Sequence, residues 1–242
     1  MKGRPESRPL LKVENLNVGY SGMPVLHDVT LEVHPAEMVA LVGSNGAGKT
    51  TLLRALSRML PCTGRVAMNG REFEGLTPDQ VFGLGLVQVP EGRQLFDRMT
   101  VQDNLLMGSY RRMDKAVIAR DLDRIYTLFP PLAERRHLLA GNMSGGEQQM
   151  CAIARALMAA PVLMMVDEMS LGLAPVVVEQ LMKVLTDIRT DGVTVLLVEQ
   201  DVHLALSYAD RGYVMETGNI VREGRARDLL NDQTIRKAYW GL

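Results

Sequence analysis

Eight residues at positions 43–50, with the sequence GSNGAGKT, have the spacing of a phosphate-binding loop. Glycines let successive backbone N–H groups turn toward a bound anion, and a helix that follows adds its positive N-terminal dipole. Lys49 supplies a positive charge for the β- and γ-phosphates, and Thr50 supplies a hydroxyl for Mg²⁺. The alternative is a glycine-rich turn with a solvated lysine. An apolar run before the loop, at 39–42, and a helical pattern after it, at 49–60, favour nucleotide binding instead.

Two carboxylates, Asp167 and Glu168, follow the apolar run at 162–166. Ligands of open α/β sheets bind at the carboxyl ends of the strands, so we expect both acids to face the phosphate loop. Asp167 is suited to hold Mg²⁺, and Glu168 to orient or deprotonate an attacking water. A solvent-exposed strand end is the alternative, because acids are common there. Beside a phosphate loop, the pair favours nucleotide hydrolysis over binding alone.

A third motif, Ser144-Gly145-Gly146-Glu147, begins a helical pattern that extends to about residue 160. Ser144 and Glu147 have the spacing of a capping box, which is a structural reading in its own right. A capping box does not require two adjacent glycines, which weaken a first helical turn. Bare backbone at this point lets a phosphate approach the helix N-terminus closely.

The elements that must position these motifs alternate between short apolar runs and helical patterns, which predicts an α/β fold with a mostly parallel sheet. Buried strands are expected at 39–42, 162–166 and 193–198, with a helix at 176–188. Gly218-Asn219 predicts a hairpin turn between strands at 213–217 and 220–221. The segment from about 100 to 160 is predicted to be a helical insertion, interrupted at Pro130-Pro131.

Composition excludes several classes of protein. The 242 residues include 27 basic and 28 acidic side chains, and this balance argues against a protein that coats nucleic acid. Two cysteines are too few for a metal cage and fit a reducing compartment. The charged stretch 1–9 lacks the apolar run of a signal peptide, and no apolar run approaches the 20 or so residues of a membrane span.

Together these motifs resemble the ATP-binding subunit of ABC transporters over about residues 10–242. The signature motif of that family is Leu-Ser-Gly-Gly-Gln, and here it reads Met-Ser-Gly-Gly-Glu. The resemblance implies one ABC ATPase domain over 1–242. Its P-loop NTPase core, at about 10–92 and 160–242, would include an N-terminal antiparallel β region, and an inserted helical subdomain would occupy about 97–159. Further segments resemble the second ATPase of branched-chain amino acid importers, with urea and short-amide importers close by: Val89-Pro90-Glu91-Gly92-Arg93, Arg98-Met99-Thr100, Ser170-Leu171-Gly172-Leu173-Ala174-Pro175 and Val198-Glu199-Gln200.

The resemblance also implies which residues bind ATP and Mg²⁺. Tyr20 matches the aromatic that stacks on adenine. The catalytic positions would be Glu168, Gln200 and Glu91, and the Mg²⁺ ligands Thr50, Asp167 and Glu91. The remaining nucleotide-binding positions would be Gly43, Ser44, Asn45, Gly46, Ala47, Gly48, Lys49, Thr50 and Thr51 in the phosphate loop, and Ser144, Gly145, Gly146 and Glu147 in the signature.

Four positions depart from the family pattern. Met169 stands where the family prefers proline and Ala174 where many members have aspartate, and no mechanism is attached to either. The other two bear on the chemistry. Glu91 stands where the family has a glutamine in the loop leading to the helical insertion, and Gln88 lies three residues too early. Gln200 replaces the switch histidine that contacts the γ-phosphate. A glutamine amide can donate a hydrogen bond but never carries a proton charge. His203 is three residues further on and is interpreted as an ordinary helix histidine.

The resemblance implies an ATP-hydrolysing importer subunit at the cytoplasmic face of a membrane. It would pair head to tail with a second ABC ATPase, dock on membrane permease subunits and serve a solute-binding protein. Because of Gln200, we hypothesise that the paired ATPase is a sister subunit with a true switch histidine. Alternatives are a soluble ABC ATPase acting in DNA repair or on ribosomes, a regulatory nucleotide sensor and a kinase. Soluble ABC ATPases of that kind usually have coiled-coil insertions or basic arms, and this sequence shows neither. Glu168 argues against a sensor, which would have no need of a water-orienting acid. The Ser-Gly-Gly helix start argues against a kinase.

Overall fold

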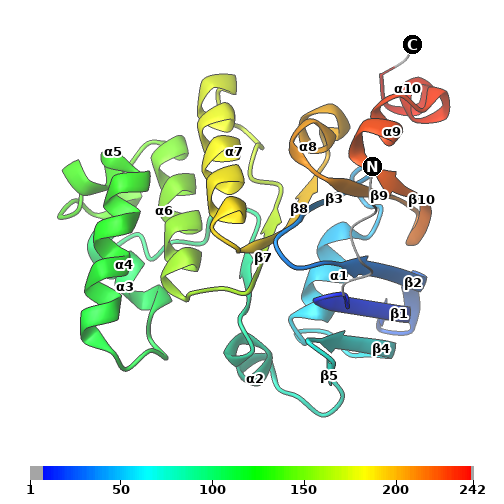
Figure 1. Ribbon diagram of the computed structural model, residues 1–242, viewed down its shortest axis with the longest axis horizontal. Helices are drawn as coiled ribbons and strands as arrows, with labels where there is room; N and C mark the ends of the chain where they lie inside the picture. The colour runs from blue at the N-terminus through cyan, green and yellow to red at the C-terminus, as the bar shows by residue number, and fades with distance from the viewer. Residues whose placement is uncertain (1–7, 241–242) are drawn as a thin grey trace.

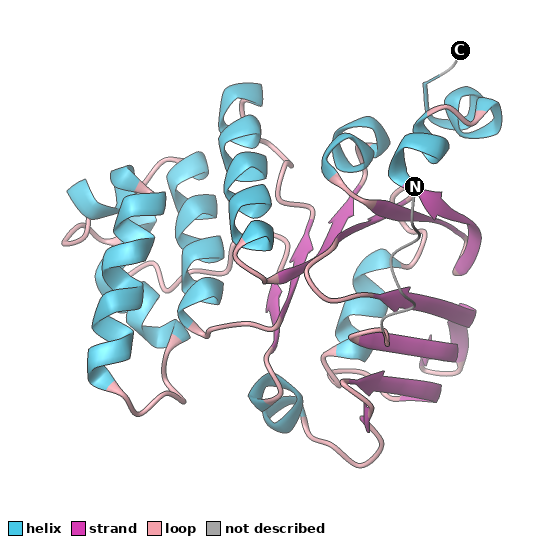
Figure 2. Ribbon diagram, in the orientation of Figure 1, coloured by secondary structure: helices cyan, strands magenta, loops and turns pink. Residues whose placement is uncertain are grey.

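The computed structural model describes residues 8–240, so most of the charged stretch at 1–9 lies outside the described residues. Figure 1 shows a central sheet with a group of helices on its left and a second, smaller sheet on its right. Figure 2 shows the same division by secondary structure, with the left part helical and the strands gathered at the centre and right. The predicted combination of a mixed α/β core with an antiparallel β region and a helical insertion is confirmed.

The central sheet has six strands in the order β10-β9-β3-β8-β7-β6. β3 (Met38–Val42), β7 (Leu163–Asp167) and β8 (Thr194–Glu199) are buried at every residue, because helices or the second sheet cover both faces. β6 (Leu86–Val89) and β9 (Arg211–Glu216) extend the parallel order on either side. β10 (Asn219–Arg225) runs antiparallel to β9 and forms the hairpin predicted at Gly218-Asn219.

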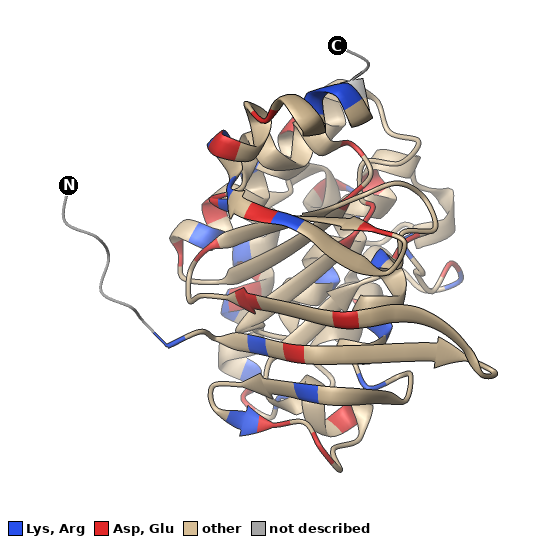
Figure 3. Cartoon of the chain, turned by 90° about the vertical axis from the view of Figure 1, so that its right-hand side faces the viewer, with Lys and Arg blue, Asp and Glu red and all other residues tan. Residues whose placement is uncertain are grey.

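The second sheet is antiparallel, in the order β2-β1-β4-β5, and comes from the N-terminal part of the chain. It consists of β1 (Leu11–Tyr20), β2 (Met23–Val33), β4 (Cys62–Met68) and β5 (Arg71–Glu72). Helix α1 (Lys49–Leu56) lies between the two sheets, and its leucines join one continuous apolar core with both. Basic and acidic side chains are interspersed over this side of the molecule (Figure 3), in agreement with the near-neutral net charge.

The helical insertion leaves the sheet after β6 and returns to it at β7. Its helices are α3 (Val101–Gly108), α4 (Lys115–Leu128), α5 (Pro130–Glu134) and α6 (Gly145–Met158), with a 3₁₀ turn at Ala140–Asn142. α3 and α6 approach so closely that a Cβ on Gly108 would lie 1.9 Å from the carbonyl oxygen of Arg155. The exact division of the chain into a core and a subdomain stays a prediction.

The remaining helices cover the outside of the central sheet. α7 (Pro175–Thr190) and α8 (Val202–Tyr208) follow β7 and β8, α2 (Pro78–Gly83) precedes β6, and α9 (Ala226–Leu230) and α10 (Gln233–Trp240) end the described chain. Among residues 8–240, no helix combines the length and the apolar character that crossing a bilayer requires.

Two helix boundaries differ from those that the sequence predicts. The helix that starts at Lys49 ends at Leu56 and not near residue 60, because Arg58 adopts a left-handed conformation with φ of 58°. Pro130 starts the short helix α5 and does not simply interrupt a longer one. This placement is favourable, since proline lacks an N–H that a first helical turn would leave unpaired anyway.

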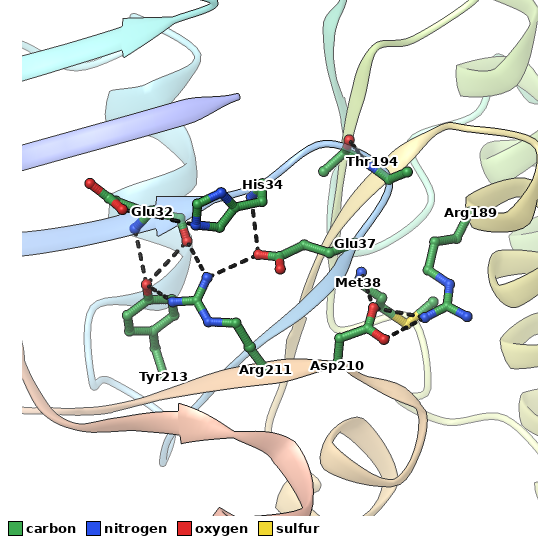
Figure 4. A network of polar contacts seen from close by, with 10 residues as sticks. Glu32, His34, Glu37, Met38, Arg189, Thr194, Asp210, Arg211 and Tyr213 are labelled. Carbon is green, nitrogen blue, oxygen red and sulfur yellow. Dashed lines mark hydrogen bonds and ion pairs between the residues drawn. The ribbon is translucent and has the colours of Figure 1, made fainter. Parts of the chain in front are cut away.

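A polar network joins the two sheets at the amino ends of the core strands (Figure 4). The Tyr213 hydroxyl accepts from the Glu32 backbone N–H and donates to the Glu32 carbonyl, at 3.0 and 3.1 Å. Arg211 bonds both this hydroxyl, at 2.7 Å, and the Glu37 carboxylate, at 3.0 Å. Because the strands are parallel, the network holds the edge of the sheet opposite the phosphate loop.

Candidate functional site

The phosphate loop connects the carboxyl end of β3 to the first residue of α1, as its sequence predicts. Gly48 has a φ of 109°, and a Cβ there would lie 2.6 Å from the Leu26 side chain. A Cβ on Gly43 would lie 2.2 Å from the Met215 carbonyl oxygen. The hairpin of β9 and β10 supports the loop from behind, since the Gly218 N–H donates to the Ala47 carbonyl at 2.8 Å. Glycine is therefore required at these positions by space and by backbone conformation.

Lys49 is 4% exposed and has three acceptors around its ammonium group. Nζ donates to the carbonyl oxygens of Gly43 and Ser44, at 2.9 and 3.2 Å. It also lies 3.1 Å from Oε1 of Glu168, whose side chain is only 11% exposed. A nucleotide phosphate that takes this lysine must compete with the Glu168 carboxylate.

Asp167 is the last residue of β7 and is 1% exposed. Neither carboxylate oxygen has a hydrogen-bond partner among the described residues. Burial raises the pKa of Asp167 to about 6, nearby Glu168 and Glu91 add to the rise, and the Thr50 hydroxyl and Lys49 oppose it. A buried carboxylate with unused acceptors normally has a partner that completes it.

Mg²⁺ fits this arrangement. It prefers oxygen ligands, and it usually uses one or two protein groups together with water and substrate phosphates. Asp167 and the Thr50 hydroxyl supply such oxygens beside the phosphate loop. Within the described part of the chain, no group of three or more His, Cys, Asp or Glu residues is arranged to hold a metal. The oxygens of Asp167 and Thr50 suit a cation that takes its remaining ligands from water and nucleotide phosphates.

Glu168 follows Asp167 in a left-handed backbone conformation, with a φ of 44°. Its N–H donates to the Val198 carbonyl at 2.8 Å, which fastens this turn to the neighbouring strand β8. Glu91 follows β6 and is exposed, but it lies near enough to raise the pKa of Asp167. Gln88 is oriented differently, because its side-chain oxygen accepts from the Ser57 hydroxyl at 2.9 Å.

Gln200 is exposed just after β8 and lines a cleft of about 530 Å³ together with Glu168 and Ser170. Tyr20 is 36% exposed at the end of β1, and its hydroxyl lies 3.4 Å from that of Thr51. The structure thus brings Tyr20, the phosphate loop, Asp167, Glu168 and Gln200 to the carboxyl edge of the central sheet.

The signature residues lie apart from this group. They start helix α6 in the helical insertion, whereas α1 lies on the other side of the central sheet (Figure 1). The capping box is present: the Ser144 N–H donates to the Glu147 carboxylate at 2.9 Å, and the Glu147 N–H donates to the Ser144 hydroxyl at 3.4 Å. Glu147 also pairs with Arg135 at 2.7 Å. A carboxylate at this position therefore has partners within its own subdomain.

Gly145 and Gly146 leave room for neighbouring side chains. A Cβ on Gly145 would lie 2.9 Å from the guanidinium of Arg93, and one on Gly146 would lie 2.9 Å from Val177. Arg93 donates to the Gln148 side chain at 3.0 Å and so connects the loop that carries Glu91 to the first turn of α6. Sequence reasoning missed this contact, which joins residues far apart in the chain.

Sequence reasoning also missed Glu199, which is 1% exposed at the end of β8. Its carboxylate accepts from the backbone N–H and the hydroxyl of Ser170, at 3.1 and 2.7 Å. Burial raises the pKa of Glu199 to about 7, the two bonds from Ser170 oppose the rise, and Glu168 and Asp201 add to it. A carboxylate directly after a continuous apolar strand was the available signal, the same one that identified Asp167.

Comparison with known proteins identifies the class. Residues 26–170 match the ABC transporter family, and the chain belongs to that family. It is accordingly an ABC-type ATP hydrolase.

Similar proteins cover nearly the whole chain. It is 43% identical to the high-affinity branched-chain amino acid transport ATP-binding protein BraG of Pseudomonas aeruginosa, over 96% of this chain and 100% of the relative. It is 31% identical to the corresponding protein LivG of Escherichia coli K12, over 97% and 99% of the two chains. Among solved structures, the ADP conformation of an ATP-binding cassette of an ABC transporter superposes with a TM-score of 0.85, at 25% identity, over 98% and 100% of the chains.

The contact between Lys49 and Glu168 leads to a first prediction. Glu168→Gln removes the charge that holds Lys49, so we expect ADP to bind about tenfold more tightly, equivalent to about 1.4 kcal/mol. Fluorescence titration with a labelled ADP, without Mg²⁺, measures this affinity. ADP is chosen because it lacks the γ-phosphate and so isolates binding by one chain.

Glu91→Gln is the matched control, because it removes one negative charge from the same region without an ion pair to Lys49. We expect its ADP affinity to stay within about twofold of the wild type, a difference well below 1 kcal/mol. Equal affinity in the wild type and Glu168→Gln would contradict the competition between phosphate and Glu168.

Proposed function

We propose that this chain powers the import of branched-chain amino acids. ATP would close it against a second ABC ATPase, and hydrolysis would let the two subunits separate. The observation that carries the proposal is the division of the nucleotide motifs between two parts of the chain: the phosphate loop and acids on the core sheet, and the signature turn on the helical insertion. The solute class is supported by the 43% identity to BraG over the full length of that relative.

Each ATP would lie between the phosphate loop of one subunit and the Ser144 turn of the other. Lys49 and the loop N–H groups would hold the phosphates, Tyr20 the adenine, and the bare backbone at Gly145 and Gly146 would face the γ-phosphate. Mg²⁺ held by Thr50 and Asp167, with Glu91 beside them, would neutralise part of the charge on the phosphates. The signature helix thereby contributes only when two subunits meet.

Glu168 would orient the attacking water and accept its proton once ATP has drawn Lys49 away from it. Gln200 would donate an amide hydrogen bond to the γ-phosphate, in place of a histidine that could also carry charge. Loss of the γ-phosphate removes the contacts that span the two subunits, and the dimer opens. This is the order-and-release logic of other nucleotide switches.

Permease subunits would dock at the loop between residues 91 and 104 and on the helical insertion. In support, a hollow of about 390 Å³ lies there between the core and the insertion, with Pro90, Phe96 and Tyr110 in its lining. Phe96 is 47% exposed, and the Arg155 guanidinium stacks over its ring at 5.6 Å. Such docking would hold the chain at the cytoplasmic face of the membrane and couple it indirectly to a solute-binding protein.

Two alternatives stay open. The transported solute could be urea or a short amide, because those importers share the same subfamily motifs. A soluble ABC ATPase without a transport role is the other, and it is disfavoured by the near-neutral net charge.

Uptake measurements test the proposal. In cells that lack the native gene, we expect the wild-type chain to restore uptake of radiolabelled leucine and Lys49→Ala to restore none of it, because the phosphates lose their cation. Lys12→Ala is the matched control, since Lys12 is a half-exposed lysine on the second sheet that pairs with Glu14. If cells with Lys49→Ala lose urea uptake and keep normal leucine uptake, the chain serves a urea importer. If they take up both solutes normally, a role in transport is contradicted.

We further propose that the natural partner is a sister ATPase with a switch histidine, on the basis of Gln200. Tagged and untagged copies of this chain produced in the same cells distinguish the two arrangements. Purification of the solubilised membrane complex through the tag should yield a different ABC ATPase in equal amount and no untagged copy. Untagged copies in the purified complex would contradict the sister-subunit proposal.

A further inference from the structure

Glu199 occupies a position between the two groups proposed to act on the γ-phosphate and on water. It ends strand β8 and directly precedes Gln200. The neighbouring strand β7 ends in Asp167, and Glu168 and Ser170 follow in the connecting loop. Glu199 is thus a buried acid of the site that the proposed reaction does not use.

Both oxygens of the Glu199 carboxylate contact one residue of that loop. The Ser170 N–H donates to Oε1 at 3.1 Å, and the Ser170 hydroxyl donates to Oε2 at 2.7 Å. A carboxylate that is 1% exposed would be very costly without such partners. Two bonds to a single residue fix orientation as well as distance, which one apolar contact could not do.

A third hydrogen bond runs between the same two segments. The Glu168 N–H donates to the Val198 carbonyl at 2.8 Å, one residue before Glu199. The backbone of Glu168, with its φ of 44°, is therefore held on one side by Val198 and, two residues later, by Glu199 through Ser170. If the bonds between Ser170 and Glu199 are lost, the turn that orients the Glu168 side chain keeps only its backbone bond to Val198 among these contacts with β8.

We propose that Glu199 is a positioning residue for ATP hydrolysis, which sets the loop carrying Glu168 relative to the strand end carrying Gln200 through its two hydrogen bonds with Ser170. The inference rests on the roles proposed above for Glu168 and Gln200. It predicts a loss of turnover and not a loss of nucleotide affinity, because the groups that would hold the phosphates, Lys49, Thr50 and the loop N–H groups, come from a different strand, β3, and its helix.

Four single-residue variants of the purified membrane complex test the positioning role of Glu199. Glu199→Ala removes both bonds, and Ser170→Ala removes the one from the hydroxyl. Glu199→Gln keeps two, since its carbonyl still accepts from the Ser170 N–H and its amide can donate to the hydroxyl oxygen. Ser170→Thr keeps the hydroxyl. Steady-state ATPase measurements give kcat and KM for each variant, and labelled ADP gives the affinity.

We expect kcat to fall about tenfold or more in Glu199→Ala, the size of effect that a misplaced catalytic group produces. KM should stay within about twofold, and ADP should bind no more weakly than to the wild type, because a displaced Glu168 carboxylate competes less for Lys49. Glu199→Gln and Ser170→Thr should retain kcat within about threefold of the wild type. The Ser170→Ala change should have little further effect in the Glu199→Ala background, because the two residues act as one unit. If Glu199→Ala fails to fold, the same question is answered by comparing kcat in Ser170→Ala, where we expect a fall, with kcat in Ser170→Thr, which keeps the hydroxyl.

An unchanged kcat in Glu199→Ala, or a fall in kcat matched by an equal loss of ADP affinity, would overturn the positioning role. Lys49→Ala in the same complex separates this failure from failure of the proposed function. If that variant still hydrolyses ATP at the wild-type rate, the proposed use of the phosphate loop is wrong, whatever Glu199 does.

Discussion

The structure depends on one buried cation, the Lys49 ammonium, which lies among several acids at the carboxyl ends of the core strands. Lys49 is 4% exposed and lies 3.1 Å from Glu168, while Asp167 and Glu199 are each 1% exposed at the ends of adjacent strands. Burial raises the pKa values of Asp167 and Glu199, and the like charges of neighbouring acids add to the rise. The Mg²⁺ ion that we propose to bind with the nucleotide would supply positive charge to this group of acids.

This concentration of charge on the core sheet contrasts with the uncharged signature turn. The core supplies a lysine, a hydroxyl and several acids, whereas the signature turn supplies uncharged backbone on α6, in the helical insertion. Arg93 and Arg155 connect the loop after β6 to that helix, through Gln148 and through the Gln94 carbonyl. A displacement of this loop, where permease subunits are proposed to dock, would therefore move the signature turn and the surroundings of Glu91.

Local patterns predicted the parts of the site that local chemistry determines. The phosphate loop, the acids after β7, the Ser144 capping box and the hairpin at Gly218-Asn219 all follow from short segments, and the structure contains each of them. The pairing of Glu199 with Ser170 could not be predicted, because it requires knowing that β7 and β8 are neighbours. The end of α1 was missed for a different reason, since the left-handed conformation of Arg58 has no signal in residue type.

One chain carries both halves of a nucleotide site, and we propose that ATP joins them across two subunits. The most direct test is the solution mass of purified Glu168→Gln protein by light scattering, with and without ATP. This variant keeps the phosphate loop and the signature but lacks the acid that we propose to act on water, so a closed dimer should be trapped. Each copy carries the motifs of both halves, so ATP should double the 26.7 kDa mass in vitro, where this chain is the only ATPase present and no sister subunit competes for it. A protein saturated with ATP that stays at 26.7 kDa would contradict closure between two copies of this chain, and would mean that only a sister subunit can complete the site.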